Sequence, residues 1–514
     1  APLSPGALEE RRRELHRRCA EEVLSLCRSN GGLFIKMAQH AATLKPALPD
    51  EYVETLATLQ DRAPVQPLSE IAKVIREELG MAPDADLTGP ASPFREIVEP
   101  PVGSASLAQV HRAVLHDGTE VAMKVQHAHL KSTLASDLHI ARCLEWAASI
   151  LFRGEGFSLA WAIDEFDTNV SLELDFEREA ANAERCREMF AQHPRLSQSV
   201  VVPRVHKEFS SRRVLTMDFA NGVPIRELCS AARETGDESL VSIASEAAAT
   251  LVDAFSAMVF AFGFIHCDPH PGNLLVIPPS FDDPAAPTRL VLLDHGLYRD
   301  LPETTRLANC GLWEAMALQD MEGIERHCAA MGIDARIAEV LPLYFTNRSA
   351  STRAGLGQPI TPAQKAEIRQ QLIRAGLLGG EGGSAPSLSF RALGDFADRL
   401  PTDLVFIMRT MHLVASLHRA LGGRAADRFR TYARTATEAE WLGPLTVKDG
   451  GAVRRLRLTI RSICGRVSGF VFMLRFGIHE VAGWLSAARA GDLVETAREH
   501  FSIAQALAES GATA

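Results

Sequence analysis

The sequence lacks the features that cross-link small domains or carry a chain through a membrane. Its nine cysteines are scattered over 514 residues and include no C-x-x-C pair. A disulfide framework and a structural zinc site are therefore not expected, and a reducing compartment is favoured. No stretch reaches the roughly 18 uninterrupted apolar residues of a membrane-spanning helix.

Positive charge is also in short supply. Lys and Arg together number 54 against 64 Asp and Glu, which gives a net charge of −10. Nucleic acid is not expected as a partner, because phosphate contacts need a basic surface. Only 8 of the basic residues are Lys and 46 are Arg. A lysine in a motif therefore indicates a position where a compact ammonium is needed instead of the wider guanidinium fork.

The rest of the composition is that of a globular protein, with 46% hydrophobic and 23% charged residues, enough for two or three domains. Periodicity predicts helices over 1–30, 33–44, 50–59, 69–80, 130–152 and 160–190 and through most of the chain after 223. It predicts strands over 98–114, 119–126, 200–205, 213–219, 274–277 and 290–293, with a hairpin turn at His116-Asp117-Gly118 between the first two, and a Gly/Ser-rich loop over 376–387. This order is typical of an α+β fold and not of alternating βαβ units.

The strongest chemical signal is a loop with one carboxylate, followed by a second acidic motif. Residues His266–Asn273 read H-C-D-P-H-P-G-N, and Asp294–Gly296 follows the next predicted strand. Asp268 and Asn273 have the interval of the protein-kinase motif H-R-D-x-x-x-x-N, and Asp294 corresponds to the Asp of D-F-G. Phosphoryl transfer needs a carboxylate that accepts a hydroxyl proton, and oxygen ligands for Mg²⁺. We predict Asp268 as the catalytic carboxylate and Asn273 and Asp294 as metal ligands.

Two other interpretations of this loop stay open. Its polar side chains could simply cap turns at the end of a strand. Alternatively, His266 and His270 have the H-x-x-x-H spacing of metal ligands, although Pro269 between them disfavours the uninterrupted helix that this spacing needs.

A lysine lies on a predicted strand upstream of this loop. Residues Val121–Val125 read V-A-M-K-V, similar to the kinase pattern V-A-I-K, whose lysine contacts nucleotide phosphates. Lys124 is therefore predicted as a catalytic and nucleotide-binding residue, with an exposed edge-strand lysine as the alternative. Further upstream, where kinases have a Gly-rich loop, the chain has small residues whose backbone N–H groups can approach phosphate. These predicted nucleotide-binding residues are Gly103, Ser104, Ala105 and Ser106.

Carboxylates that could hold Lys124 lie on a predicted helix. Glu173 and Glu177 share one face of that helix, and Asp175 and Glu179 share another. Glu179 is the partner that we predict for Lys124. A solvated acidic face is the alternative, since acidic helix faces commonly point to water.

Two further segments carry weaker signals. Met217 and Phe219 follow a predicted strand and fit a hinge that contacts adenine through backbone groups, and a plain strand end fits equally well. Residues 452–486 read as a basic helix with aromatic side chains that could lie on an anionic lipid or membrane surface. A packed helical tail is the alternative that the composition favours.

Taken in order, these motifs resemble the UbiB family of atypical kinases, also called aarF-domain-containing kinases. The resemblance spans about residues 20–425 and is closest to the eukaryotic mitochondrial subgroup. It rests on Lys36–Gln39, the A-S-L-A-Q-V-H run over 105–111, Val121–Lys124, Glu173–Asp175, His266–Asn273 and Asp294–Gly296.

The resemblance implies a protein-kinase-like two-lobe fold that binds ATP or ADP with Mg²⁺ between its lobes. It implies a helical N-terminal extension over 1–97, an N-lobe over 98–222, a helical C-lobe over 223–425 and a helical tail over 426–514. In the family a K-x-G-Q helix lies over the active site. By that match Lys36 and Gln39 point into the cleft and meet Glu173 and Asp175, while Ala38 replaces the motif glycine.

The resemblance further implies a role in coenzyme Q or other lipid metabolism, association with membranes and with a protein complex, and a place at the mitochondrial inner membrane. A plastid or a bacterial membrane surface is the alternative location. Two other functions stay open. One is a non-enzymatic nucleotide-binding scaffold in a larger complex. The other is a small-molecule phosphotransferase of the aminoglycoside or choline kinase type, which would lack the helix at Lys36–Gln39.

Overall fold

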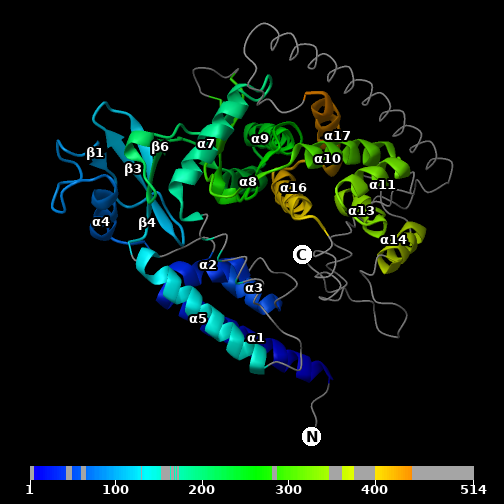
Figure 1. The fold of residues 1–514 in the computed structure, drawn as a ribbon, viewed down its shortest axis with the longest axis horizontal. Helices are drawn as coiled ribbons and strands as arrows, with labels where there is room; N and C mark the ends of the chain where they lie inside the picture. Colours follow the sequence, from blue (N-terminus) through cyan, green and yellow to red (C-terminus); the bar gives the residue numbers. More distant parts are fainter. Residues whose placement is uncertain are drawn as a thin grey trace. The chain divides into compact units, whose positions relative to one another are not determined.

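A computed structural model describes residues 5–41, 49–59, 65–128, 130–151, 173–279, 286–346, 362–374 and 400–442, together with the single residues 163, 167 and 170. The chain forms two compact units (Figure 1). Unit 1 comprises Ala1–Arg187, Val202–Asn221 and Asp294–Leu297. Unit 2 comprises Glu188–Val201, Gly222–Leu293 and Tyr298–Ala514. The predicted loop at 376–387 and the predicted basic helix at 452–486 lie outside the described residues.

Unit 1 contains an antiparallel five-stranded sheet in which four strands have the order β1-β3-β4-β6 and β2 pairs with β3. The strands are β1 (Phe94–Ile97), β2 (Gly103–Ser104), β3 (Ala108–Leu115), β4 (Glu120–Gln126) and β6 (Val214–Asp218). The predicted hairpin between β3 and β4 is confirmed. Its turn is closed by a hydrogen bond from Leu115 N to Thr119 O (2.9 Å), and Gly118 adopts a φ of 92° that favours glycine.

The side chains of β4 point alternately into the hydrophobic core of unit 1 and to the face of the sheet that carries Lys124. Val121, Met123 and Val125 are fully buried and pack with residues of helix α4 (Leu68–Glu78) and of β1 and β6. Because successive side chains of a strand point to opposite faces, Lys124 projects from the other face of the sheet. The same strand therefore anchors the core and presents the lysine.

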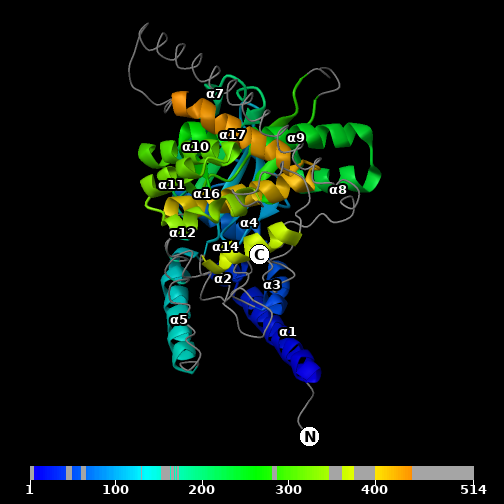
Figure 2. The same ribbon diagram turned by 90° about the vertical axis from the view of Figure 1, so that its right-hand side faces the viewer.

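The helices at the start of the chain form a second part of unit 1 (Figures 1 and 2). They are α1 (Pro5–Asn30), α2 (Gly32–Ala41), α3 (Asp50–Ala57) and α5 (Leu130–Leu151). Gly31, with a φ of 67°, separates α1 from α2. Cys27, Ile35 and Leu56 pack together among α1, α2 and α3. The helices predicted over 1–30, 33–44, 50–59 and 69–80 are confirmed within the described residues.

One long helix was expected over 160–190, and this prediction is wrong at 174–175. Leu174 and Asp175 are not helical, and α7 (Phe176–Ala191) begins afterwards. The Asp175 carboxylate accepts a hydrogen bond from Arg178 N (3.2 Å), which caps the start of α7. Consequently the carboxylates on the two sides of the break do not share the helix faces that we predicted.

Unit 2 holds two small sheets and most of the helices. In the first sheet the order is β5-β10-β9-β7, with β5 parallel to β10, and in the second β8 pairs with β11. The strands are β5 (Val200–Val201), β7 (Val223–Pro224), β8 (Phe264–His266), β9 (Leu274–Ile277), β10 (Arg289–Leu292) and β11 (Tyr298–Asp300). The strands predicted at 274–277 and 290–293 are confirmed, the strand predicted over 200–205 stops at Val201, and β8 and β11 were not predicted.

Unit 2 contains nine α-helices among the described residues. They are α8 (Ile225–Thr235), α9 (Glu238–Ser256), α10 (Glu303–Leu318), α11 (Met321–Ala330), α12 (Ala335–Ala338), α13 (Leu341–Thr346), α14 (Pro362–Arg374), α16 (Thr402–Ala420) and α17 (Ala425–Leu442). Among the described residues, one helix, Glu238–Phe262, is long and apolar enough to cross a membrane, and 67% of its apolar window is buried. Because α9 contacts α8, α16 and α17, we interpret it as the core helix of unit 2.

A π-helical turn, η2 (Ala257–Phe262), connects α9 to β8. Its Phe260 carbonyl accepts a hydrogen bond from the buried Arg306 guanidinium, which also bonds Glu303 (2.7 and 2.8 Å). Gly263 ends the turn with a φ of 63°, and a Cβ there would lie 3.1 Å from Arg306 Cδ. Arg306 thus fixes the backbone directly before the strand that leads into the His266–Asn273 loop.

Candidate active site

The structure brings Lys124, Glu179 and Asp294 together in unit 1. Lys124 Nζ, on β4, donates to Glu179 Oε1 (2.7 Å) and Oε2 (2.9 Å) on α7, and to Asp294 Oδ2 (3.2 Å). The side chain of Glu179 is 2% exposed, that of Lys124 is 17% exposed and that of Asp294 is 41% exposed. The group therefore combines a buried carboxylate, that of Glu179, with a solvent-accessible one, that of Asp294.

Burial and charge act in opposite directions on this group. Burial alone lowers the pKa of Lys124, but Asp294 and Glu179 more than offset that effect, so the pKa is raised and the amine stays charged. Burial raises the pKa of Glu179 to about 7, against the lowering effect of Lys124. Glu179 is thus the member of the group that changes charge near neutral pH.

Two side chains that the sequence did not single out, those of Phe176 and Asn182, support this arrangement, together with the backbone of His295. The Phe176 ring centroid lies 5.0 Å from Lys124 Nζ, a cation–π distance. Glu179 Oε1 accepts from His295 N (3.4 Å), and Asn182 Nδ2 donates to His295 O (3.0 Å). Phe176, Glu179 and Asn182 recur every three residues on α7, so correct placement of the helix start would have revealed them.

The backbone after Asp294 holds its carboxylate. Gly296 N donates to Asp294 Oδ1 (3.0 Å). A Cβ at Gly296 would lie only 3.2 Å from that same oxygen. The glycine of the Asp294–Gly296 motif therefore leaves room for the carboxylate that it binds.

The small-residue loop before β3 is held by the residue after β4. Gly103 and Ser104 form β2, Ala105 is exposed and Ser106 is buried. Ala105 N donates to Ala108 O (2.8 Å), which makes a tight turn. The ring of His127 bonds Ala105 O (3.0 Å), and its backbone N donates to Leu107 O (3.0 Å).

The helix α2 reaches one of its predicted partners. Lys36 Nζ lies 2.7 Å from Glu173 Oε2. Gln39 does not meet Glu173 or Asp175, because its amide donates to Leu59 O (2.9 Å), and Asp175 caps α7 instead. Ala38, at the position of the motif glycine, is buried and packs with Cys27 and Ile35.

The predicted hinge uses its backbone N–H groups inside the protein. Met217, in β6, is opposite Ala122 and forms a bridge with Val205. Phe219 N donates to Glu120 O (3.0 Å), and its ring lies 5.1 Å from the Arg112 guanidinium carbon. Phe219 therefore cannot offer its N–H to an adenine, and its carbonyl is the backbone group that is left.

In unit 2 the predicted loop brings Asp268 and Asn273 together. The Asn273 amide donates to Asp268 O (3.3 Å), and His270 N donates to the same carbonyl (2.7 Å). His266 and His270 accept backbone N–H groups from Asp268 and Gly272 through Nδ1 (3.2 Å each). Both histidines thus shape the loop, and the described residues contain no cluster of three or more His, Cys, Asp or Glu that could hold a metal.

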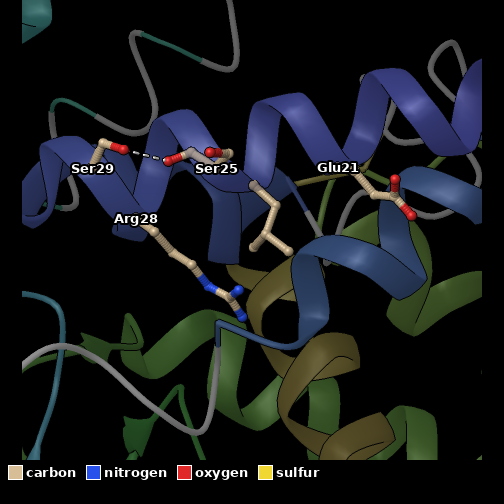
Figure 3. A pocket seen from close by; sticks show the side chains of 5 residues that line it. Glu21, Ser25, Arg28 and Ser29 are labelled. Atoms are coloured by element: carbon tan, nitrogen blue, oxygen red, sulfur yellow. Dashed lines mark hydrogen bonds between the residues drawn. The ribbon is translucent and has the colours of Figure 1, made fainter.

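A surface depression of about 470 Å³ lies along α1, away from these motifs in the sequence (Figure 3). Its lining residues are Glu21, Leu24, Ser25, Arg28 and Ser29. The Ser29 hydroxyl donates to Ser25 O (2.9 Å) within the helix. None of the predicted site residues lines this depression.

Comparison with known proteins identifies the family. The ABC1 atypical kinase-like domain matches residues 58–328. AarF domain-containing protein kinase 1 of Mus musculus is 33% identical over 487 residues, which cover 93% of this chain and 85% of the mouse protein. The chain belongs to the ABC1/AarF (UbiB) family of atypical kinases. The predicted resemblance and the kinase-like α+β fold class are thereby confirmed.

A second relative and a solved structure are also similar to this ABC1/AarF protein. A probable serine/threonine-protein kinase, abkD, of Dictyostelium discoideum is 31% identical over 87% of this chain and 59% of that protein. Among solved structures, Rv3197 of Mycobacterium tuberculosis, in complex with erythromycin, is 20% identical with a TM-score of 0.49 and covers 83% of this chain and 99% of that chain. The family supports a phosphotransferase in general.

Proposed function

We propose that this ABC1/AarF protein binds ATP or ADP with Mg²⁺ through Lys124 and Asp294 and transfers the terminal phosphoryl group of ATP. The supporting observation is a nearly buried lysine held by two carboxylates from separate elements, with hydrogen bonds of 2.7, 2.9 and 3.2 Å. A lysine fixed and kept charged in this way is suited to bind phosphate without reorganisation.

The side chains present suit the nucleotide and its metal. Mg²⁺ takes hard oxygen ligands and commonly binds one or two protein carboxylates, with phosphate oxygens and water completing the octahedron. Asp294, with 41% of its side chain exposed, can supply such a ligand, and a cluster of several acidic residues is not required. When bound, the ion would neutralise charge on the phosphates. Lys124 would add a second, fixed positive charge from the protein.

Each remaining residue of unit 1 has a supporting role in this proposal. Glu179 holds Lys124 in place from inside the protein, and Phe176 lies against the ammonium. The loop Gly103–Ser106 can offer backbone N–H groups to phosphate, except that of Ala105, which donates to Ala108 O. Met217 and Phe219 can offer carbonyl groups to an adenine amine.

Asp268 and Asn273 enter through the resemblance to the kinase motif. We propose that the Asp268 carboxylate accepts the proton of the acceptor hydroxyl and that Asn273 supplies a second metal ligand. The loop of unit 2 supports this by joining the two residues through the Asn273 amide and the Asp268 carbonyl. The acceptor is water, a small molecule, a lipid or a protein hydroxyl.

The cellular assignments rest on the family resemblance. We propose a role in coenzyme Q or other lipid metabolism, contact with a lipid surface and with a protein complex, and a place at the mitochondrial inner membrane. Fractionation of cells that express the full-length protein, with extraction of the membrane pellet by salt and by carbonate, tests the location. Recovery of the protein in the soluble fraction alone would contradict it.

A thermal-shift titration with Mg–ATP and Mg–ADP tests nucleotide binding. Ligand at 100 times its dissociation constant should add about 2.7 kcal/mol to the free energy of unfolding. Asp294→Asn should lose most of this gain, while the control Asp84→Asn, at an exposed residue of unit 1, should keep it. No shift in the wild type would exclude the proposed function, and a shift without phosphate release or transfer would favour the scaffold alternative.

A further inference from the structure

Two residues close to Lys124 on the chain, separated from it by Val125, are buried and polar, which is costly unless their groups are hydrogen-bonded. Gln126 ends β4 and is 4% exposed, and His127 follows the strand and is 3% exposed. Neither side chain touches the Lys124 ammonium in a hydrogen bond of the structure. Each instead bonds backbone beside one of two elements of unit 1: the helix α7, which carries Glu179, and the small-residue loop before β3.

Gln126 fastens the start of α7 to β4. Its amide nitrogen donates to Leu174 O (2.7 Å) and to Arg212 O (3.3 Å), so both N–H bonds of the amide are used. Arg212 O also accepts from Phe176 N (3.1 Å). Since α7 carries Phe176 and Glu179, Gln126 sets the position from which these two side chains reach Lys124.

His127 fastens the small-residue loop to the same strand end. Because its ring partner is the Ala105 carbonyl, Nε2 must carry the hydrogen, and both the neutral and the protonated ring can donate it. The His127 backbone N–H holds Leu107 O. The Leu107 side chain is buried in a cluster with Leu33 of α2 and Leu130 of α5. The loop is therefore bound both by its backbone and by a hydrophobic side chain.

We propose that Gln126 and His127 are positioning residues that hold α7 and the small-residue loop in their working places before any ligand arrives. This rests on the proposed nucleotide function of Lys124. His127 acts on nucleotide affinity through the loop. Gln126 acts on the Lys124–Glu179 pair and hence on turnover. In this protein the small-residue loop is held in one conformation and does not act as a mobile lid.

Amide hydrogen exchange of the full-length, nucleotide-free protein tests the fastening itself. His127→Ala should raise exchange in the peptide that contains Ala105–Ala108 by about tenfold, and Gln126→Met should do so at Phe176–Glu179. Each variant should leave the other segment unchanged. The matched control is Thr216→Val, which removes a buried hydroxyl that donates to Phe209 O (2.7 Å) on the same sheet. Equal, sheet-wide increases in all three variants would overturn the assignment to specific elements.

Nucleotide kinetics test the consequence. His127→Ala should raise KM for Mg–ATP about five- to tenfold with little change in kcat, and His127→Gln, which retains a side-chain N–H, should recover part of the affinity. Gln126→Met should lower kcat with a smaller change in KM. Unchanged kinetics in both variants, beside a wild type that turns over, would refute the positioning roles. A wild type that neither binds nor hydrolyses nucleotide would refute the proposed function. The exchange experiment would still show whether Gln126 holds the start of α7 and His127 holds the small-residue loop.

Discussion

In unit 1, Lys124 meets one partner 55 residues away and another 170 residues away, whereas in unit 2 the Asp268–Asn273 contact closes within five residues. The first arrangement depends on the correct packing of a strand, a helix and a distant loop. The second depends on backbone hydrogen bonds inside one short loop. Charged groups in unit 1 are thus sensitive to single substitutions, and the unit 2 loop should keep its shape more easily.

Removal of the lysine should have the largest effect of any single change. Lys124→Met leaves Glu179 buried without its cation, which should lower the free energy of unfolding by about 3 kcal/mol at pH 8 and abolish nucleotide turnover. Chemical denaturation and phosphate release measure the two losses. The double variant Lys124→Met/Glu179→Gln should recover most of the stability but none of the turnover. Wild-type stability in the single variant would show that the buried pair is not coupled as the structure indicates.

Acidification should weaken the contact between Glu179 and Lys124 in unit 1. The pKa of Glu179 is raised to about 7, so its charge is lost as pH falls through about 7 and its hold on Lys124 weakens. We expect nucleotide affinity to fall about threefold or more between pH 7.5 and 5.5. Glu179→Gln should be weaker at pH 7.5 and should lack this part of the pH dependence.

The raised pKa of Glu179 has the opposite effect on folding stability, to which this residue should contribute more on acidification. The folded protein takes up the Glu179 proton at a higher pH than the unfolded chain, so this residue favours folding increasingly as pH falls from about 7 toward 4.5. Urea unfolding of wild type and Glu179→Gln across this range measures the contribution. A Glu179 contribution that weakens on acidification would contradict the burial of the carboxylate.

A methyl group added at Gly296, beside Asp294, should weaken ligand binding with little effect on stability. Gly296→Ala puts a Cβ about 3.2 Å from Asp294 Oδ1, so the carboxylate must shift. Mg–nucleotide affinity should fall about tenfold, and the melting temperature should change little. Titration calorimetry with Mg–ADP checks the affinity. A normal affinity would mean that Asp294 is not a metal ligand in the conformation described.

A small effect on stability is expected inside the unit 2 loop. Asn273→Ala removes one hydrogen bond, from its amide to Asp268 O, and should lower the free energy of unfolding by about 1 kcal/mol. The loop should persist, because His266 and His270 also bond its backbone. Amide exchange of Asp268 and Gly272 measures the loop directly. Collapse of exchange protection across the whole loop would show that its order depends on this one side chain.

These differences also explain what the sequence could predict. The hairpin turn at 116–118 and the loop His266–Asn273 are formed by residues a few positions apart, so both could be predicted from the local sequence pattern. The break at Leu174 was not, because the Gln126 amide that binds its carbonyl lies 48 residues away. Likewise Gln39 was assigned to a cleft by family resemblance, whereas its partner is the backbone of Leu59.

The pairing of Lys124 with Glu179 lies between these cases. The strand pattern indicated the lysine, and the scarcity of lysine strengthened the prediction. Several carboxylates between 173 and 179 could have been its partner, and only the start of α7 at Phe176 decides among them. The three-residue strands β8 and β11 are too short for a period-2 pattern to reveal.

The contact between Lys36 and Glu173 has a consequence for the solution conditions in which the protein works. Both side chains are about one quarter exposed, so dissolved ions reach them, and the screening length falls from about 8 Å at 0.15 M to about 3 Å at 1 M ionic strength, close to the length of this contact. Glu179 is shielded from the solvent, so its grip on Lys124 should hardly respond. Raising the salt concentration should therefore weaken the contact through which Lys36 of α2 binds Glu173, while Lys124 stays bound to Glu179. Ionic strength should thus act selectively on Lys36.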